Sequence, residues 1–213
     1  AIAPRSPGDY APSAGGRAVE SLRDAAEPLR GARILHVSAA GGDGRVPELL
    51  GGMLPLAAEM GVEVEWRVLF GPPEPRATAR ALQAGLRGAE SAIDDAAWDA
   101  FLDDCARTGR SLPETYDAVV LHDSAIGLTV GIETPCVWRC HDDVSRPEAE
   151  ALDRVGPLAR GCAVVLVPDL SFAPAGGLGE RLVAAPPGID PLDSRNLELE
   201  VRLPGRVVRP LGV

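Results

Sequence analysis

Short apolar runs alternate with longer amphipathic segments along most of this chain. The runs at 33–38, 62–69, 118–121, 136–140, 163–167 and 182–184 have the length and residue types of strands. Helical spacing of apolar residues appears at about 19–29 and 46–56, in a long region to about 107 with a break near 88–94, at 126–130 and at 147–158.

Helices that separate successive strands are typical of βαβ units and a parallel sheet. We therefore predict an α/β fold with a doubly wound, mostly parallel Rossmann-like sheet and helices on both faces. Residues 1–16, rich in Pro, Gly and Ser, are expected to form a flexible or surface-draped arm. One domain is expected over 17–196, and the polar stretch 197–213 is expected to be a tail or the start of a second domain.

Charge and composition exclude several kinds of partner. The formal net charge is −10, which argues against nucleic acid or an anionic membrane surface. No apolar run reaches the roughly 20 residues that a membrane span requires, and no secretory leader is recognisable, so we expect a cytoplasmic protein. All 21 basic residues are arginine, which excludes Schiff-base chemistry and the lysine of a phosphate-binding loop.

Histidine and aspartate follow two of the predicted strands at the point where each strand ends. His122 and Asp123 follow the run 118–121, and His141 and Asp142 follow the run 136–140. Because ligands bind at the carboxyl ends of strands in open α/β sheets, these side chains are expected to line one site. His122 and Asp123 have a second interpretation, in which they only order their own loop. The third histidine, His36, lies inside the first predicted strand and is expected to be a core residue.

A glycine-rich turn follows the first predicted strand. Gly41, Gly42 and Gly44, with Arg45 after them, either approach a phosphate group or simply allow the tight turn. A metal site is not expected, because the adjacent carboxylates of Asp142 and the next residue point in different directions. The four cysteines lack paired spacing and are expected to be small buried hydrophobes.

Several motifs resemble the N-terminal half of glycosyltransferring trehalose synthases. They are Arg-Ile-Leu-His-Val-Ser at 33–38, Val-Glu-Trp-Arg-Val at 64–68, His-Asp at 122–123, Trp-Arg-Cys-His at 138–141 and Pro-Pro-Gly-Ile-Asp-Pro at 186–191. The resemblance implies a retaining transferase with two Rossmann-like domains (GT-B), in which the C-terminal domain binds a nucleotide-diphosphate-glucose donor and the N-terminal domain binds the acceptor sugar.

The resemblance also implies roles for individual residues. His141 would line the cleft near the donor sugar, and His122, Asp123, Arg139 and Asp142 would contact the acceptor. No cofactor is implied beyond the nucleotide-sugar substrate.

The chain departs from the family pattern in three places. Asp43 interrupts the glycine turn, Ser124 and Ala125 replace a Pro-Gln pair, and the nucleotide-binding half is absent. One hypothesis is therefore an acceptor-side domain that is inactive until a second domain or partner subunit completes it. The alternative is a non-catalytic sugar-binding, regulatory or structural homologue. A homodimer through the face that normally meets the second domain is a further expectation.

Overall fold

A computed structural model describes residues 5–39, 44–69, 73–113, 115–175, 177–178, 181–188 and 190–192, together with two short strands at 201–203 and 206–208. Only the backbone is described for Pro73, Glu74 and those two strands. Gly41 and Gly42 of the predicted phosphate-binding turn, and Asp43 directly after them, lie outside the described residues.

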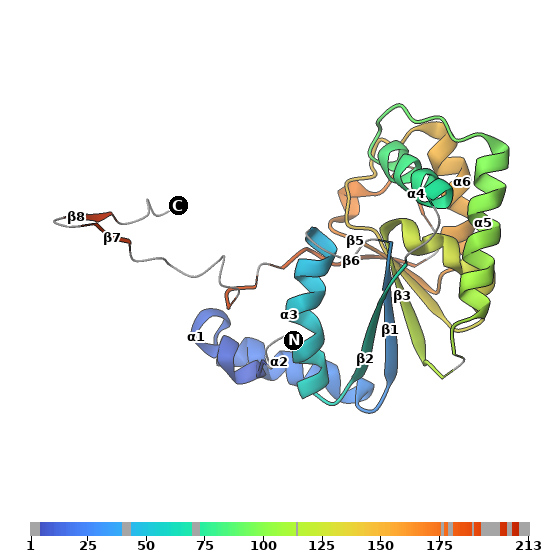
Figure 1. Cartoon of the computed structure of the whole chain (residues 1–213). Coiled ribbons are helices and arrows are strands. Elements are labelled where there is room, and N and C mark those ends of the chain that lie inside the picture. Colours follow the sequence, from blue (N-terminus) through green and yellow to red (C-terminus); the bar gives the residue numbers. More distant parts are fainter. Residues whose placement is uncertain are drawn as a thin grey trace.

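A parallel six-stranded sheet forms the centre of the molecule (Figure 1). Its strands are β1 (Arg33–Ser38), β2 (Glu63–Val68), β3 (Ala118–His122), β4 (Cys136–Arg139), β5 (Val164–Val167) and β6 (Leu182–Ala184). They lie in the order β2-β1-β3-β4-β5-β6, with every neighbouring pair parallel. β2 is added on one side of β1, and the later strands from β3 onward are added on the other side. The boundary between β1 and β3 is therefore the switch point of the strand order, where ligands bind in such folds.

Helices cover both faces of this sheet, so the predicted doubly wound α/β fold is confirmed (Figure 1). On one side lies α3 (Arg45–Glu59), with α1 (Ala11–Ala14) and α2 (Gly16–Ala26) near it. On the other side lie α4 (Pro73–Leu86), α5 (Asp95–Arg110) and α6 (Ala149–Arg160). Short 3-10 helices are η1 (Pro7–Tyr10), η2 (Glu27–Leu29), η3 (Asp123–Gly131) and η4 (Leu170–Phe172).

Side chains of the central strands form the core with α4, α5 and α6. Leu35 and Val37 of β1, Leu121 of β3 and Trp138 of β4 are completely buried. Such alternating apolar positions bury against the helices, and each large side chain contributes about 1.5–3 kcal/mol of hydrophobic stabilisation. No helix among the described residues is long and apolar enough to span a bilayer.

The N-terminal segment and the segment that leaves the sheet after β6 are joined by Asp190. Arg5 and Tyr10 both donate hydrogen bonds to its carboxylate, and Arg5 also forms an ion pair with it. The described part of the predicted N-terminal arm therefore forms η1 and α1 and contacts the main domain. Strands β7 (Val201–Leu203) and β8 (Arg206–Val208) pair with each other as an antiparallel hairpin.

The 3-10 helix η3 begins directly at the end of β3 and packs closely on α5. Gly131 and Gly109 make this approach possible: a Cβ at Gly131 would lie 2.5 Å from the carbonyl oxygen of Ala106 and 2.9 Å from its Cα. The sequence predicted a short helix only at 126–130, because the polar residues at its start carry no helical periodicity. The contact with α5 fixes the segment that starts at Asp123.

We expect Gly131→Ala to lower the free energy of unfolding by about 3 kcal/mol, because the added methyl group meets backbone atoms of α5 that have no room to move. The matched control is Gly51→Ala in α3, where a Cβ would meet nothing within 4 Å. That change should leave stability unchanged or raise it by up to about 1 kcal/mol. Urea unfolding of both variants measures the difference, and equal stabilities would contradict the close packing of η3.

Candidate functional site

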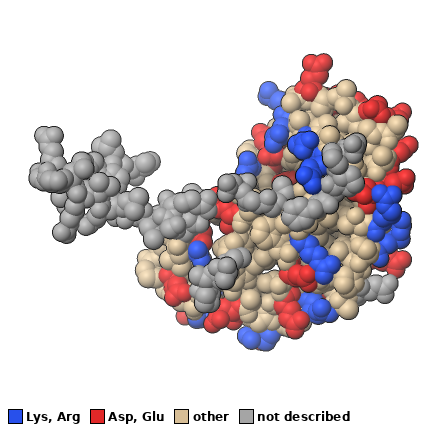
Figure 2. All heavy atoms as spheres, in the orientation of Figure 1, with Lys and Arg blue, Asp and Glu red and all other residues tan. Residues whose placement is uncertain are grey.

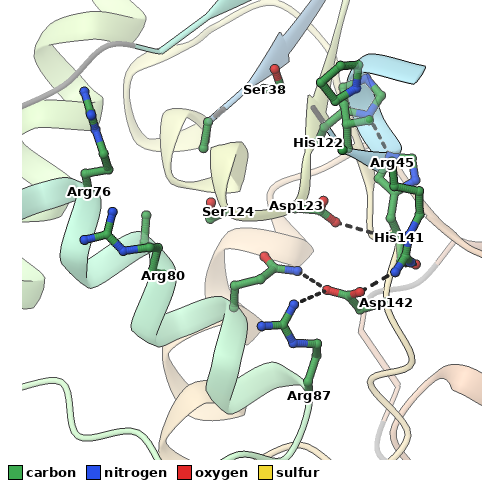
Figure 3. Close-up of a pocket in the computed structure, with 16 residues that line it drawn as sticks. Ser38, Arg45, Arg76, Arg80, Arg87, His122, Asp123, Ser124, His141 and Asp142 are labelled. Atoms are coloured by element: carbon green, nitrogen blue, oxygen red, sulfur yellow. Dashed lines mark hydrogen bonds and ion pairs between the residues drawn. The ribbon is translucent and has the colours of Figure 1, made fainter. Parts of the chain in front are cut away.

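A cavity of about 360 Å³ lies at the carboxyl edge of the sheet, between the ends of the strands and α4 (Figure 3). Its volume is in the range of small-molecule sites, and its position is the switch point of the sheet. It is lined by Ser38, Ala39, Gly44, Arg45, Val46, Pro47, Arg76, Ala79, Arg80, Gln83, Arg87, His122, Asp123, Ser124, His141 and Asp142.

Most of the residues singled out in the sequence meet at this cavity. His122, Asp123, His141, Asp142, Gly44 and Arg45 all line it. Arg139 does not line it: this side chain is half-buried on β4, directly beside His122 in the register of β3 and β4. The two strand ends therefore converge as the motif positions predicted, while the role of each side chain remains a prediction.

Asp123 joins the loops that follow β3 and β4. Its backbone φ is 51°, in the left-handed region that aspartate tolerates better than most residues. Its carbonyl oxygen accepts a 2.9 Å hydrogen bond from the indole N–H of Trp138, and its carboxylate accepts one of 2.9 Å from the backbone N–H of His141. Burial raises the pKa of the carboxyl group to about 6, against the lowering effect of the hydrogen bond from His141.

The three histidines of the chain form one stack that runs from β1 through the end of β3 to the loop after β4. His36 Nδ1 lies 3.1 Å from His122 Nε2, and His122 Nδ1 lies 2.8 Å from His141 Nε2. The ring centroids are 5.4 and 5.1 Å apart, with interplanar angles of 28° and 14°. His36 is buried, as the sequence predicted, but its contact with His122 makes it part of the wall behind the cavity.

All three imidazoles are held in the neutral form. Burial is the main cause, and it lowers the pKa of His36 to about 4, of His122 to about 2 and of His141 to about 4. The positive charge of Arg139 lowers each value further. At neutral pH the stack is therefore uncharged and has one N–H per ring.

Asp142 is a buried carboxylate surrounded by donors from α3, from α4 and from the residue that follows α4. Gln83 Nε2 donates a 2.5 Å hydrogen bond to it, Arg45 lies at 3.4 Å and Arg87 at 3.6 Å (Figure 3). Arg45 also donates a 2.5 Å hydrogen bond to the carbonyl oxygen of His141. Both arginines are more than half exposed, so their charges reach the cavity as well as Asp142.

One face of α4 supplies basic residues that the sequence analysis missed. Arg76, Arg80 and Gln83 follow one another along this helix, Arg87 comes directly after its last residue, and all four line the cavity (Figure 3). Figure 2 shows arginine side chains gathered over α4 on a surface of otherwise mixed charge. Their spacing of four, three and four residues is a helical signal that they share one face, but it does not show that this face borders a site.

Arg76 and Arg80 lie one helical turn apart and repel each other, which costs an isolated helix a few tenths of a kcal/mol. Together with Arg45 and Arg87 they place four positive charges around two carboxylates, in a chain whose net charge is −10. The cavity is thus a local basic region suited to an anionic ligand.

The histidines and carboxylates described at this cavity are not arranged as the ligands of a metal ion. Within the part of the chain that the structure describes, no set of three His, Cys, Asp or Glu residues has the arrangement of a metal site. The four cysteine thiols are free and largely buried, and burial raises their pKa values above the ordinary range.

The free energy of unfolding should fall as the pH is lowered from 7 to about 4.5. The histidine pKa values are lower in the folded state than in the unfolded state, so the unfolded chain binds more protons below about pH 6.5. Each histidine then removes up to about 1.4 kcal/mol of stability per pH unit. The contribution of Asp123 to the pH dependence of stability has the opposite sign, because its raised pKa in the folded state favours that state at low pH.

Asp123→Asn removes this opposing contribution, so its stability should fall more steeply between pH 6.5 and 5 than that of the unmodified chain. Chemical unfolding at a series of pH values measures both slopes. A stability that stays constant from pH 7 to 5 would contradict a buried, neutral histidine stack.

Comparison with known proteins shows similarity to the N-terminal part of trehalose synthases. The family described as "Trehalose synthase, N-terminal domain" matches residues 36–174. A trehalose synthase of Rubrobacter xylanophilus is 32% identical over 203 residues, and one of Pyrococcus horikoshii is 26% identical over 197 residues. Each alignment covers 90% of this chain but 48% of the relative, so the chain spans about half the length of the curated relatives it matches. The matched segment runs from His36 inside β1 to beyond β5 and includes all three stacked histidines, and the chain therefore belongs to the trehalose synthase N-terminal domain family.

Proposed function

We propose that this chain is the acceptor-side domain of a glycosyltransferase that moves glucose from a nucleotide-diphosphate-glucose to a sugar acceptor. The observation that carries the proposal is the cavity at the ends of β1, β3 and β4, in a chain that belongs to the trehalose synthase N-terminal domain family. The names of the relatives support the reaction class for this chain.

The two walls of the cavity suit the two parts of such a reaction. On the strand side, Asp123, Asp142 and His141 offer acceptor and donor atoms of the kind that bind sugar hydroxyl groups. On the other side, the arginines of α4 and Arg45 suit the diphosphate of the donor. We assign Arg139 an indirect role, since its charge acts on the histidine stack from beside His122.

In this reaction the bond between the glucose C1 and the diphosphate oxygen breaks, a bond from C1 to the acceptor oxygen forms, and the proton of that hydroxyl passes to the leaving diphosphate. The protein contributes positioning of the two sugars and stabilisation of charge on the leaving diphosphate. Because the relatives are about twice as long, a second domain or partner subunit would hold the nucleotide. We therefore propose that this chain alone is inactive.

Sugar binding by this chain is the first test. Asp142→Asn should weaken binding of glucose, measured by calorimetry, by about tenfold, since it removes a charged hydrogen-bond acceptor from the cavity wall. The matched control is Asp143→Asn in the next residue, whose exposed side chain accepts a hydrogen bond from the backbone N–H of Ser145. Equal effects of the two changes would argue against sugar binding in this cavity.

Turnover is the second test. The chain is mixed with a separately produced C-terminal half of the Rubrobacter xylanophilus relative, and glucosyl transfer from UDP-, ADP- or GDP-glucose to glucose is followed. We expect turnover only in the mixture, and a loss of about 100-fold with His141→Ala, because a polar contact near the reacting centre is removed.

The second candidate is a sugar-binding homologue without catalytic activity. It is favoured by Ser124 and Ala125, which replace the family's Pro-Gln pair and are both buried, so that no amide faces the cavity there. Sugar binding that is lost in Asp142→Asn, without turnover in any mixture, would favour this candidate over the first.

A further inference from the structure

The histidine stack runs diagonally from inside the sheet to its carboxyl edge. Ser38, two residues after His36, pairs with His122, and His122 pairs with Arg139, which lies two residues before His141. Residues two apart on a strand face the same side, so the three rings share one face of the sheet. His36 is thereby connected to the cavity through His122, at the inner end of a row whose outer end is His141.

Hydrogen-bond counting gives this row only two possible arrangements. His122 uses both ring nitrogens, and a neutral imidazole has a single N–H, so His122 must donate one bond and accept the other. If His122 donates through Nδ1 to His141, it accepts from Nδ1 of His36, and all three rings carry their proton on Nδ1. If it donates through Nε2 to His36, it accepts from Nε2 of His141, and all three carry their proton on Nε2.

We propose that His36 is a positioning residue that holds the row in the second arrangement, so that Nδ1 of His141 is an unprotonated acceptor for a hydroxyl group in the cavity. The Nε2–H form is the more stable tautomer of a neutral histidine side chain, and here all three rings adopt it together. Because Nε2 of His141 is bound to His122, Nδ1 is the one ring nitrogen through which His141 can bind a ligand.

The arrangement determines which groups His141 recognises. With Nδ1 unprotonated it accepts a hydrogen bond from an O–H group and cannot donate to a phosphate oxygen. In the same cavity the arginines of α4 and Arg45 are donors only. The row thus gives the strand wall an acceptor for hydroxyl groups, next to a helix wall that attracts anions.

The first part of the experiment needs no ligand, because the chain has only three histidines. In the whole chain labelled with ¹⁵N-histidine at pH 7, long-range ¹H–¹⁵N spectra should show protonated Nε2 and bare Nδ1 for all three rings. Couplings across the hydrogen bonds should join His141 Nε2 to His122 Nδ1 and His122 Nε2 to His36 Nδ1. A positively charged ring, an Nδ1–H form or a mixture of tautomers would overturn the proposal.

Two substitutions of His36 separate positioning from simple packing. His36→Asn keeps an oxygen near the place of Nδ1 that can accept from His122, and should leave His141 with a bare Nδ1. His36→Val leaves the buried Nε2–H of His122 without an acceptor in the second arrangement, and this cost outweighs the intrinsic preference for Nε2–H. His122 should therefore donate through Nδ1 to His141, and the proton of His141 should move to Nδ1. If both folded variants keep the tautomer of the unmodified chain, His36 does not set it; if neither folds, the spectrum of the unmodified chain still decides the tautomer.

Only the identity of the hydroxyl donor rests on the proposed function. Addition of glucose should shift the Nδ1 resonance of His141 while Nε2 stays protonated, and inorganic phosphate should not produce this shift. A correct tautomer in the free chain with no response to glucose would count against the sugar-binding function and leave the role of His36 supported. A glucose response with His141 protonated on Nδ1 would overturn the role of His36 and leave sugar binding supported.

Discussion

The hydrogen bonds of Asp123 determine the shape of the candidate site. This one residue turns the chain from β3 into η3 through a left-handed backbone, and its two kinds of oxygen bind the indole of Trp138 and the backbone N–H of His141. The loops after β3 and β4 are thereby fixed to each other. Together with the pairing of β3 and β4, this connection holds His122 and His141 in contact and defines the strand wall of the cavity.

The candidate site is basic, although the molecule as a whole carries a net negative charge. The chain is strongly acidic, yet the cavity collects arginines from α3 and α4, while the buried imidazoles behind it stay neutral. Burial penalises a charge on the histidines, and the nearby guanidinium of Arg139 penalises it again. Positive charge is therefore carried by arginine at the solvent-facing wall and is excluded from the row of rings within the sheet.

Much of the fold followed from sequence pattern, because strands buried on both faces read as continuous apolar runs. The same apolar runs predicted that the carboxyl ends of β3 and β4 lie at one edge of the sheet. That prediction placed His122, Asp123, His141 and Asp142 close together. The role of His36 was not accessible, because an interior strand position gives no sign of which neighbour its ring will meet. The arginines of α4 were missed for a different reason: only the folded helix reveals which of its faces borders the cavity.

The carboxylate of Asp190 links two stretches that are distant in sequence. Arg5 and Tyr10 bind it from the N-terminal side, and it belongs to the strand-exit segment that follows β6. Neither the N-terminal segment nor the segment after β6 can detach from the domain without breaking the same partly buried ion pair, so the two segments unfold cooperatively. A displacement of the segment after β6 would therefore also move η1, so a change in the position of η1 would indicate a movement that starts almost two hundred residues later in the chain.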